Sequence, residues 1–155
     1  VERLNVGVIG LGEIGALHCE ALIQLPQARL LAVADIDETR AKQVAGQTGA
    51  QAYQDYKELL ARADINAVII ATPDHLHKEP CIHAAKANKH ILVEKPLAMT
   101  LEDSKTIIEA AEKAKVKLMV GFTFAFFRNT NTPKPVLKKV NWETLLVFLL
   151  GARTL

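Results

Sequence analysis

The stretch Val6-Gly-Val-Ile-Gly10-Leu-Gly12-Glu-Ile-Gly15 decides the fold of this 155-residue chain. An apolar, β-like run over residues 4–9 breaks into three glycines spaced G-x-G-x-x-G, and helix-like sequence follows. A strand, glycines and a helix in this order are the context that a dinucleotide-binding turn requires. Gly10 can make the tight turn, Gly12 leaves room for a pyrophosphate, and Gly15 lets helix and strand approach closely. The alternative is that the glycines serve only a tight turn.

A carboxylate ends the next apolar run, Leu30-Leu-Ala-Val-Ala-Asp35. In this place it can accept hydrogen bonds from a ribose diol, and it would repel a 2′-phosphate. Ile36 and Asp37 bring no cation next to it, although Arg40 could reach in from the following helix. Asp35 therefore favours NAD over NADP as the cofactor.

The overall composition is that of a globular protein of one domain with a sizeable core. Hydrophobic residues make up 50% of the chain, charged residues 23%, and the formal net charge is +2, so nothing indicates binding to nucleic acid or to a membrane surface. Cys19 and Cys81 lack metal-ligand spacing and are expected to be buried free thiols. With neither a signal peptide nor a membrane span visible, we expect a cytoplasmic location.

Strand-like and helix-like stretches alternate as far as Gly121, which predicts an α/β fold. The architecture we expect is a Rossmann-type, doubly wound parallel sheet with helices on both faces. The expected strands cover residues 4–9, 30–35, 67–71, 91–93 and 117–121, and the expected helices follow the glycines and cover 38–46, 55–61, 80–87 and 101–114.

Two polar turns lie at the ends of further predicted strands. The apolar run 67–71 stops at Thr72-Pro73-Asp-His-Leu-His77, and the run 91–93 stops at Glu94-Lys-Pro96. In doubly wound sheets ligands bind at the carboxyl ends of strands, beside the point where the strand order reverses. We therefore expect the glycine turn and these two turns to converge on one crevice.

Together, the glycine turn, Asp35, Ala71-Thr-Pro-Asp-His-Leu-His77 and Glu94-Lys-Pro96 resemble the glucose–fructose oxidoreductase/inositol dehydrogenase/MocA (Gfo/Idh/MocA) family, over residues 4–122. Members of that family are two-domain enzymes, with a Rossmann domain that binds NAD or NADP and a larger α/β domain that covers the substrate. The resemblance implies a dehydrogenase that moves hydride between nicotinamide and a secondary alcohol of a sugar or cyclitol.

By the same resemblance, Lys95 lies near the nicotinamide and the reacting hydroxyl and is the candidate catalytic residue. A lysine in a partly dry cleft can hydrogen-bond that hydroxyl or lower its pKa. Pro96 after it allows a cis peptide bond, which would fix the direction of the lysine. Glu94 either orients Lys95, contacts the cofactor or is merely structural.

The turn over 72–77 resembles the family turn that packs against the nicotinamide half of the cofactor. For His77 a helix-capping role is an equal alternative. The residues expected to bind the cofactor are Gly10, Gly12, Glu13, Ile14, Gly15, Asp35, Thr72, Pro73, His77, Glu94 and Lys95.

The other histidines are expected outside the site. His18 is predicted to be a packing residue, His75 a plain surface residue, and His83 and His90 solvent-facing. Because no cluster of His, Cys and Asp has zinc spacing, we predict no metal.

Beyond about residue 122 the alternating pattern weakens. We expect residues 1–122 to form the NAD(P)-binding Rossmann domain and 123–155 to be an altered or truncated tail. That tail would hold only the first strand of a second, substrate-binding domain, which by resemblance supplies the base and the substrate-facing wall. The phenylalanines and the apolar run 145–150 of this tail predict either disorder or self-association into a homo-oligomer.

These features leave two hypotheses from different classes. The first is an NAD(P)-dependent oxidoreductase of which this chain is chiefly the nucleotide-binding domain. On this hypothesis the isolated chain binds NADH but shows no measurable turnover. The alternative is a dinucleotide-binding module or sensor without catalytic turnover. A methyltransferase that binds S-adenosylmethionine is disfavoured, because it has no use for the turn at 94–96.

Overall fold

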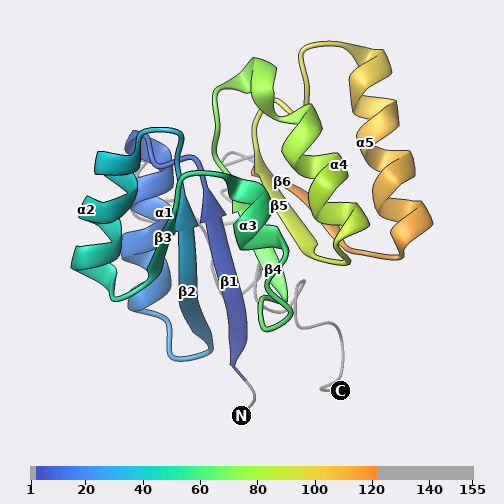
Figure 1. Ribbon diagram of the computed structural model, residues 1–155. Helices are drawn as coiled ribbons and strands as arrows, with labels where there is room; N and C mark the ends of the chain where they lie inside the picture. The colour runs from blue at the N-terminus through green and yellow to red at the C-terminus, as the bar shows by residue number, and fades with distance from the viewer. Residues whose placement is uncertain (1–2, 122–155) are drawn as a thin grey trace, which may run out of the picture.

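Six parallel strands form one sheet in the order β3-β2-β1-β4-β5-β6 (Figure 1). This computed structural model describes residues 3–121. The strands are β1 (Leu4–Ile9), β2 (Ala28–Ala34), β3 (Gln51–Tyr53), β4 (Ala67–Ile70), β5 (His90–Glu94) and β6 (Leu118–Gly121). The order reverses between β1 and β4, so the connections that follow these two strands run to opposite sides. In doubly wound sheets this is where ligands bind.

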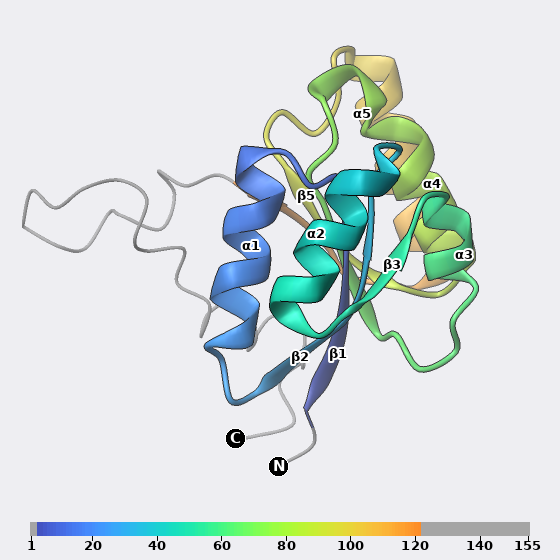
Figure 2. The same cartoon turned by 60° about the vertical axis from the view of Figure 1, so that its left-hand side comes forward.

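Helices lie on both faces of the sheet. They are α1 (Glu13–Ile23), α2 (Glu38–Thr48), α3 (Tyr56–Leu60), α4 (Lys78–Lys86) and α5 (Leu101–Ala114), with a 3₁₀ turn η1 (Asp74–Leu76) before α4. Figures 1 and 2 show α1 and α2 on one face and α3, α4 and α5 on the other. Side-chain oxygens begin three helices by accepting a hydrogen bond from the first turn, as capping requires. The capping residues are Asp37, Asp55 and Thr100.

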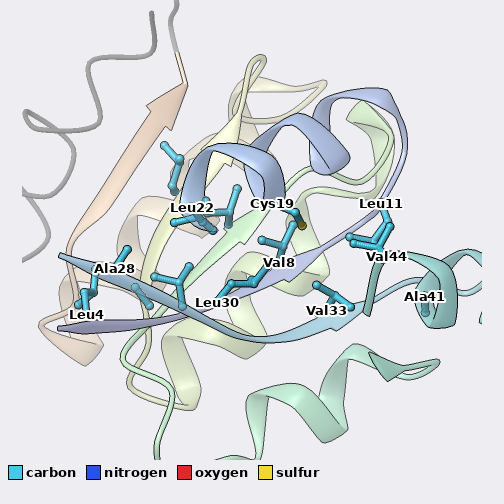
Figure 3. Packing of buried hydrophobic residues seen from close by; sticks show 14 residues of the cluster. Leu4, Val8, Leu11, Cys19, Leu22, Ala28, Leu30, Val33, Ala41 and Val44 are labelled. Atoms are coloured by element: carbon cyan, nitrogen blue, oxygen red, sulfur yellow. The ribbon is translucent and has the colours of Figure 1, made fainter. Parts of the chain in front are cut away.

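The strands divide the core into two clusters, because successive side chains point to opposite faces. Val8 packs with Cys19, Leu22 and Val44 under α1 and α2 (Figure 3). Its neighbour Ile9 packs into the second cluster, under α3, α4 and α5. The central strands are buried on both faces, which explains why they read as continuous apolar runs rather than alternating ones.

The predicted α/β fold is confirmed, including the bounds of the last helix. One strand was not predicted: β3 has only three residues, Gln51–Tyr53, too few for a period of two to show. Helix α2 also runs past Gly46 to Thr48 and ends at Gly49, whose φ of 76° is left-handed. The predictions for residues 122–155, including the domain boundary, lie outside the described residues. Over residues 3–121, no helix is long and apolar enough to cross a membrane.

Candidate functional site

Each glycine of the turn between β1 and α1 has its own geometric reason. Gly10 has φ +87°, and a Cβ there would lie 2.6 Å from the amide nitrogen of Thr72. A Cβ on Gly15 would overlap the carbonyl oxygen of Gly10, so only glycine lets α1 approach this closely. At Gly12 a Cβ would meet nothing within 4 Å. The tight turn, the open space and the close approach predicted from the spacing are all present.

The residues around this turn fit a dinucleotide phosphate group. Gly12 opens onto free space directly in front of the N-terminus of α1. Glu13, Ile14 and Gly15 form the first turn of that helix, where N–H groups have no partner within the helix and attract anions. In the turn after β4, against Gly10, the hydroxyl of Thr72 is buried without a hydrogen-bond partner among the described residues.

Asp35 is fixed beside the glycine turn by main-chain hydrogen bonds. Its Oδ2 accepts from the N–H of Leu11 at 2.7 Å, and its Oδ1 accepts from the N–H of Asp37 at 2.9 Å. Two lone-pair positions of the carboxylate therefore remain for other donors. The guanidinium of Arg40 does reach this group: its Nη1 lies 3.4 Å from both carboxylate oxygens.

Glu94, at the end of β5, joins α1 to the candidate catalytic lysine. The Nε2 of His18 donates to Oε1 of Glu94 at 2.7 Å, and Oε2 accepts from the N–H of Lys95 at 3.3 Å. Burial is the largest single influence and raises the pKa of the Glu94 carboxyl. The hydrogen bond and charge of His18, together with the N–H and charge of Lys95, outweigh it, so the pKa is lowered overall. His18, predicted to be a packing residue, is thus buried and also part of the site.

Lys95 itself is exposed, and its bond to Pro96 is a cis peptide as its sequence allows. The described residues therefore leave its amine in contact with solvent. Gly121, at the end of β6, completes this corner, since a Cβ there would come within 3.1 Å of Oε1 of Glu94.

His77 is almost fully buried, with 1% of its surface exposed. It occupies the N-cap position of α4, yet its side chain makes no capping hydrogen bond, so the predicted capping alternative is wrong. Its Nδ1 lies 2.8 Å from the carbonyl oxygen of Pro96, and its Nε2 lies 2.9 Å from that of Thr72. Pro73, beside Thr72, is exposed.

These contacts connect the predicted site residues into one continuous edge of the sheet. Leu11 of the glycine turn binds Asp35 after β2, and Gly10 lies against Thr72 after β4. His77 bridges the turns after β4 and β5, and the His18 pair returns from β5 to α1. The predicted convergence of the polar turns is therefore confirmed.

The remaining histidines and the cysteines lie elsewhere. His75 is exposed, as predicted. His83 and His90 are half-buried instead of solvent-facing. His83 shares a hydrogen bond with the hydroxyl of Tyr56, and His90 accepts one from the N–H of Lys117. Both cysteines, Cys19 and Cys81, are buried free thiols, and burial raises the pKa of each to about 12. Among residues 3–121, no group of three or more His, Cys, Asp or Glu could hold a metal ion.

Sequence reasoning missed two residues of this edge. His18 had a usable signal, since Gly15, His18, Cys19 and Leu22 share the buried face of α1. Its partner Glu94 is 76 residues away, however, and helical spacing gives no information on such a pair. Leu11 contributes only its main-chain N–H, for which side-chain patterns carry no signal.

Known proteins share this domain. A myo-inositol 2-dehydrogenase of Thermotoga maritima is 39% identical over 127 residues, which are 81% of this chain and 38% of that protein. The crystal structure of GenD2 from gentamicin A biosynthesis, in complex with NAD, superposes with a TM-score of 0.79 at 33% identity, covering 81% of this chain and 36% of the other. KijD10, a 3-ketoreductase from Actinomadura kijaniata crystallised with NADP as a Y186F mutant, gives 0.76 at 31% identity, covering 83% and 40%.

The chain thus spans between about a third and two fifths of the length of these relatives. The family model described as an oxidoreductase family with an NAD-binding Rossmann fold matches residues 4–122. That range holds the glycine turn, Asp35 and the turns after β4 and β5, and the chain belongs to this Gfo/Idh/MocA oxidoreductase family.

Proposed function

We propose that this chain supplies the cofactor-binding domain of an NAD(P)-dependent dehydrogenase acting on a secondary alcohol of a sugar or cyclitol. The substrate class follows the resemblance of the site motifs, and the relative from Thermotoga maritima is named for the cyclitol myo-inositol. Nicotinamide, when bound, would give or take the hydride.

One observation carries the proposal: a single edge of the sheet holds a glycine turn at the N-terminus of α1, the Asp35 carboxylate and Lys95. Leu11 N–H joins the first two, and the His18–Glu94 pair joins the first to the third. A dinucleotide is a long ligand with a pyrophosphate in its middle, so it needs separate groups along one line of this kind. An isolated turn for phosphate would not need Lys95 at the end of β5.

The chain's own residues would bind, orient and polarise. The first turn of α1 would hold the pyrophosphate, and Asp35 would accept hydrogen bonds from the ribose hydroxyls. Lys95 would donate a hydrogen bond to the reacting oxygen of the substrate and so stabilise negative charge on it during oxidation. Because the lysine amine is exposed among the described residues, a substrate bound over this edge can reach it.

The cofactor preference we propose is for NAD. If Asp35 accepts hydrogen bonds from the ribose hydroxyls, a 2′-phosphate in the same place would be repelled by its carboxylate. The Arg40 guanidinium lowers this preference because it lies within 3.4 Å of the carboxylate and is 47% exposed. Related structures contain NAD in GenD2 and NADP in KijD10, so the balance between these two residues has to be measured.

The test is titration of the purified 155-residue chain with NADH and with ADP-ribose. Nicotinamide fluorescence and calorimetry monitor the binding of NADH, and calorimetry monitors that of ADP-ribose. The proposal expects saturable binding of NADH to one site per chain. Assay of the same chain with myo-inositol and with aldoses then distinguishes the enzyme from a binding module. Absence of NADH binding would overturn the proposal, whereas S-adenosylmethionine displacing NADH with higher affinity would favour a methyltransferase.

A further inference from the structure

Both ring nitrogens of His77 face main-chain oxygens, one from each of two neighbouring turns. Nδ1 lies 2.8 Å from the carbonyl oxygen of Pro96 after β5, and Nε2 lies 2.9 Å from that of Thr72 after β4. Only 1% of the residue is exposed, so solvent is not available to satisfy either nitrogen in place of these oxygens.

Two hydrogen bonds of this kind require two protons on the ring. A carbonyl oxygen only accepts, and a neutral imidazole has one N–H and one lone pair. In the neutral form, one nitrogen of His77 would therefore set a lone pair against a buried carbonyl oxygen. The imidazolium form has two N–H groups and donates to both.

The link extends to the candidate catalytic lysine through the main chain. Pro96 directly follows Lys95, so its carbonyl fixes the chain on one side of the lysine. On the other side, the N–H of Lys95 donates to Glu94, which is itself held by His18 of α1. Because the Lys95 side chain is exposed, main-chain anchors rather than side-chain packing set its direction.

Several titratable groups lie on the elements around the ring. Lys78 at the start of α4 pairs with Asp103 of α5 at 2.6 Å. The thiol of Cys81, one turn along α4, stays neutral because burial raises its pKa to about 12. Asp74 of η1 and Lys95 after β5 are both exposed, so solvent screens the opposite effects of their charges on a cation at His77.

We propose that His77 acts as an imidazolium positioning residue that ties the turns after β4 and β5 and so fixes the nicotinamide end of the site. The inference rests on the proposed function, because it takes a dinucleotide to lie along this edge. The glycine turn and Asp35, which would hold the ADP half, make no described hydrogen bond to His77, and Gly10 touches the turn after β4 at the main chain of Ala71 and Thr72. Loosening the tie should therefore weaken binding of the nicotinamide half alone.

The proton occupancy of the ring is measured directly by nitrogen NMR of the chain labelled with ¹⁵N-histidine, at pH 7. His77→Gln assigns the signals. Two protonated ring nitrogens on His77 support the tie. A neutral tautomer, with one protonated and one lone-pair nitrogen, overturns it.

The positioning role is measured by comparing NADH with ADP-ribose, which lacks nicotinamide. For His77→Gln we expect NADH affinity to fall about tenfold, as it would if only about a tenth of the molecules kept the two turns in the binding arrangement. We expect ADP-ribose affinity to stay within about twofold. His75→Gln, on the same turn but exposed, is the matched control and should change neither. Far-UV circular dichroism and urea denaturation confirm that each variant is folded.

Three other outcomes contradict the inference and are distinguishable. If His77→Gln weakens both ligands equally, the residue is merely structural. If the unmutated chain binds NADH and ADP-ribose equally well, the turns after β4 and β5 do not hold the nicotinamide half. If the unmutated chain binds neither ligand, the proposed function fails, and the inference fails with it.

Discussion

The sharpest test of the glycine turn is to add one methyl group at each of its first two glycines. Gly10→Ala would place a Cβ 2.6 Å from Thr72 N and 2.7 Å from the carbonyl of Ala71, both main-chain atoms, at a φ of +87°. A left-handed conformation alone costs an L-residue roughly 1–2 kcal/mol. Moving the main chain of Ala71 and Thr72, just after β4, away from Gly10 adds to this cost, so we expect a total destabilisation of about 2–4 kcal/mol.

Gly12→Ala should behave in the opposite way. Gly12 has φ −63° and ψ −169°, which alanine adopts, and its Cβ would meet nothing within 4 Å. The free energy of unfolding should therefore change by less than about 1 kcal/mol. The methyl group would occupy the space in front of α1 that the pyrophosphate needs, so NADH affinity should fall by about tenfold or more.

Gly46→Ala is the control, because this exposed glycine lies inside α2 and its Cβ would also meet nothing within 4 Å. It should stabilise the chain by up to about 1 kcal/mol and leave NADH binding unchanged. The assays are urea denaturation of the three variants and NADH titration of those that fold. The reasoning is refuted if Gly12→Ala binds NADH as tightly as the unmutated chain, or if Gly10→Ala is as stable as Gly46→Ala.

Three further experiments address the charges of the site. Replacing Asp35 with serine should narrow the preference for NADH over NADPH, and Arg40→Ala should widen it, both measured by competitive titration; an unchanged ratio in both would contradict the assignment. Glu94→Gln should lower the free energy of unfolding by about 1.5–3 kcal/mol above pH 4.5, the ordinary pKa of a glutamate carboxyl, because the pKa of Glu94 is lowered in the folded chain. Urea titrations should show the difference between the two proteins vanishing as the pH falls through the pKa of Glu94 in the folded chain. A difference that grows toward low pH would argue against the pair with His18. The 155-residue chain should bind NADH without measurable turnover of cyclitols or aldoses, and turnover abolished by Lys95→Ala would disprove this.

The sequence was most informative where local chemistry alone determines the structure. The three glycines, the last helix over residues 101–114 and the apolar central strands each follow from neighbours a few residues apart, and all are present. The convergence of the turns followed from a general rule of parallel sheets, which needs no knowledge of any contact.

The sequence did not predict contacts in which the hydrogen-bond partner is distant along the chain or is a main-chain atom. His77 faces two carbonyl oxygens 5 and 19 residues away. Every residue has a main-chain carbonyl, so the sequence does not indicate which of them a side chain contacts. Arg40 was noted only as able to reach Asp35, because rotamers decide whether it does. Half-burial of His83 and His90 depends on Tyr56 and Lys117, both 27 residues from their partners.

The reversal of strand order between β1 and β4 separates the residues that would select the cofactor from the residues at the reacting end of the site. Asp35 and Arg40, which would choose between NAD and NADP, follow β2 on one side of the reversal. Lys95, Glu94 and His77 follow β4 and β5 on the other side, and His18 of α1 reaches across to Glu94. A change of cofactor preference at Asp35 therefore need not disturb the geometry of the reacting end. With this arrangement, evolution or protein engineering can change the cofactor preference and the residues at the reacting end in separate steps.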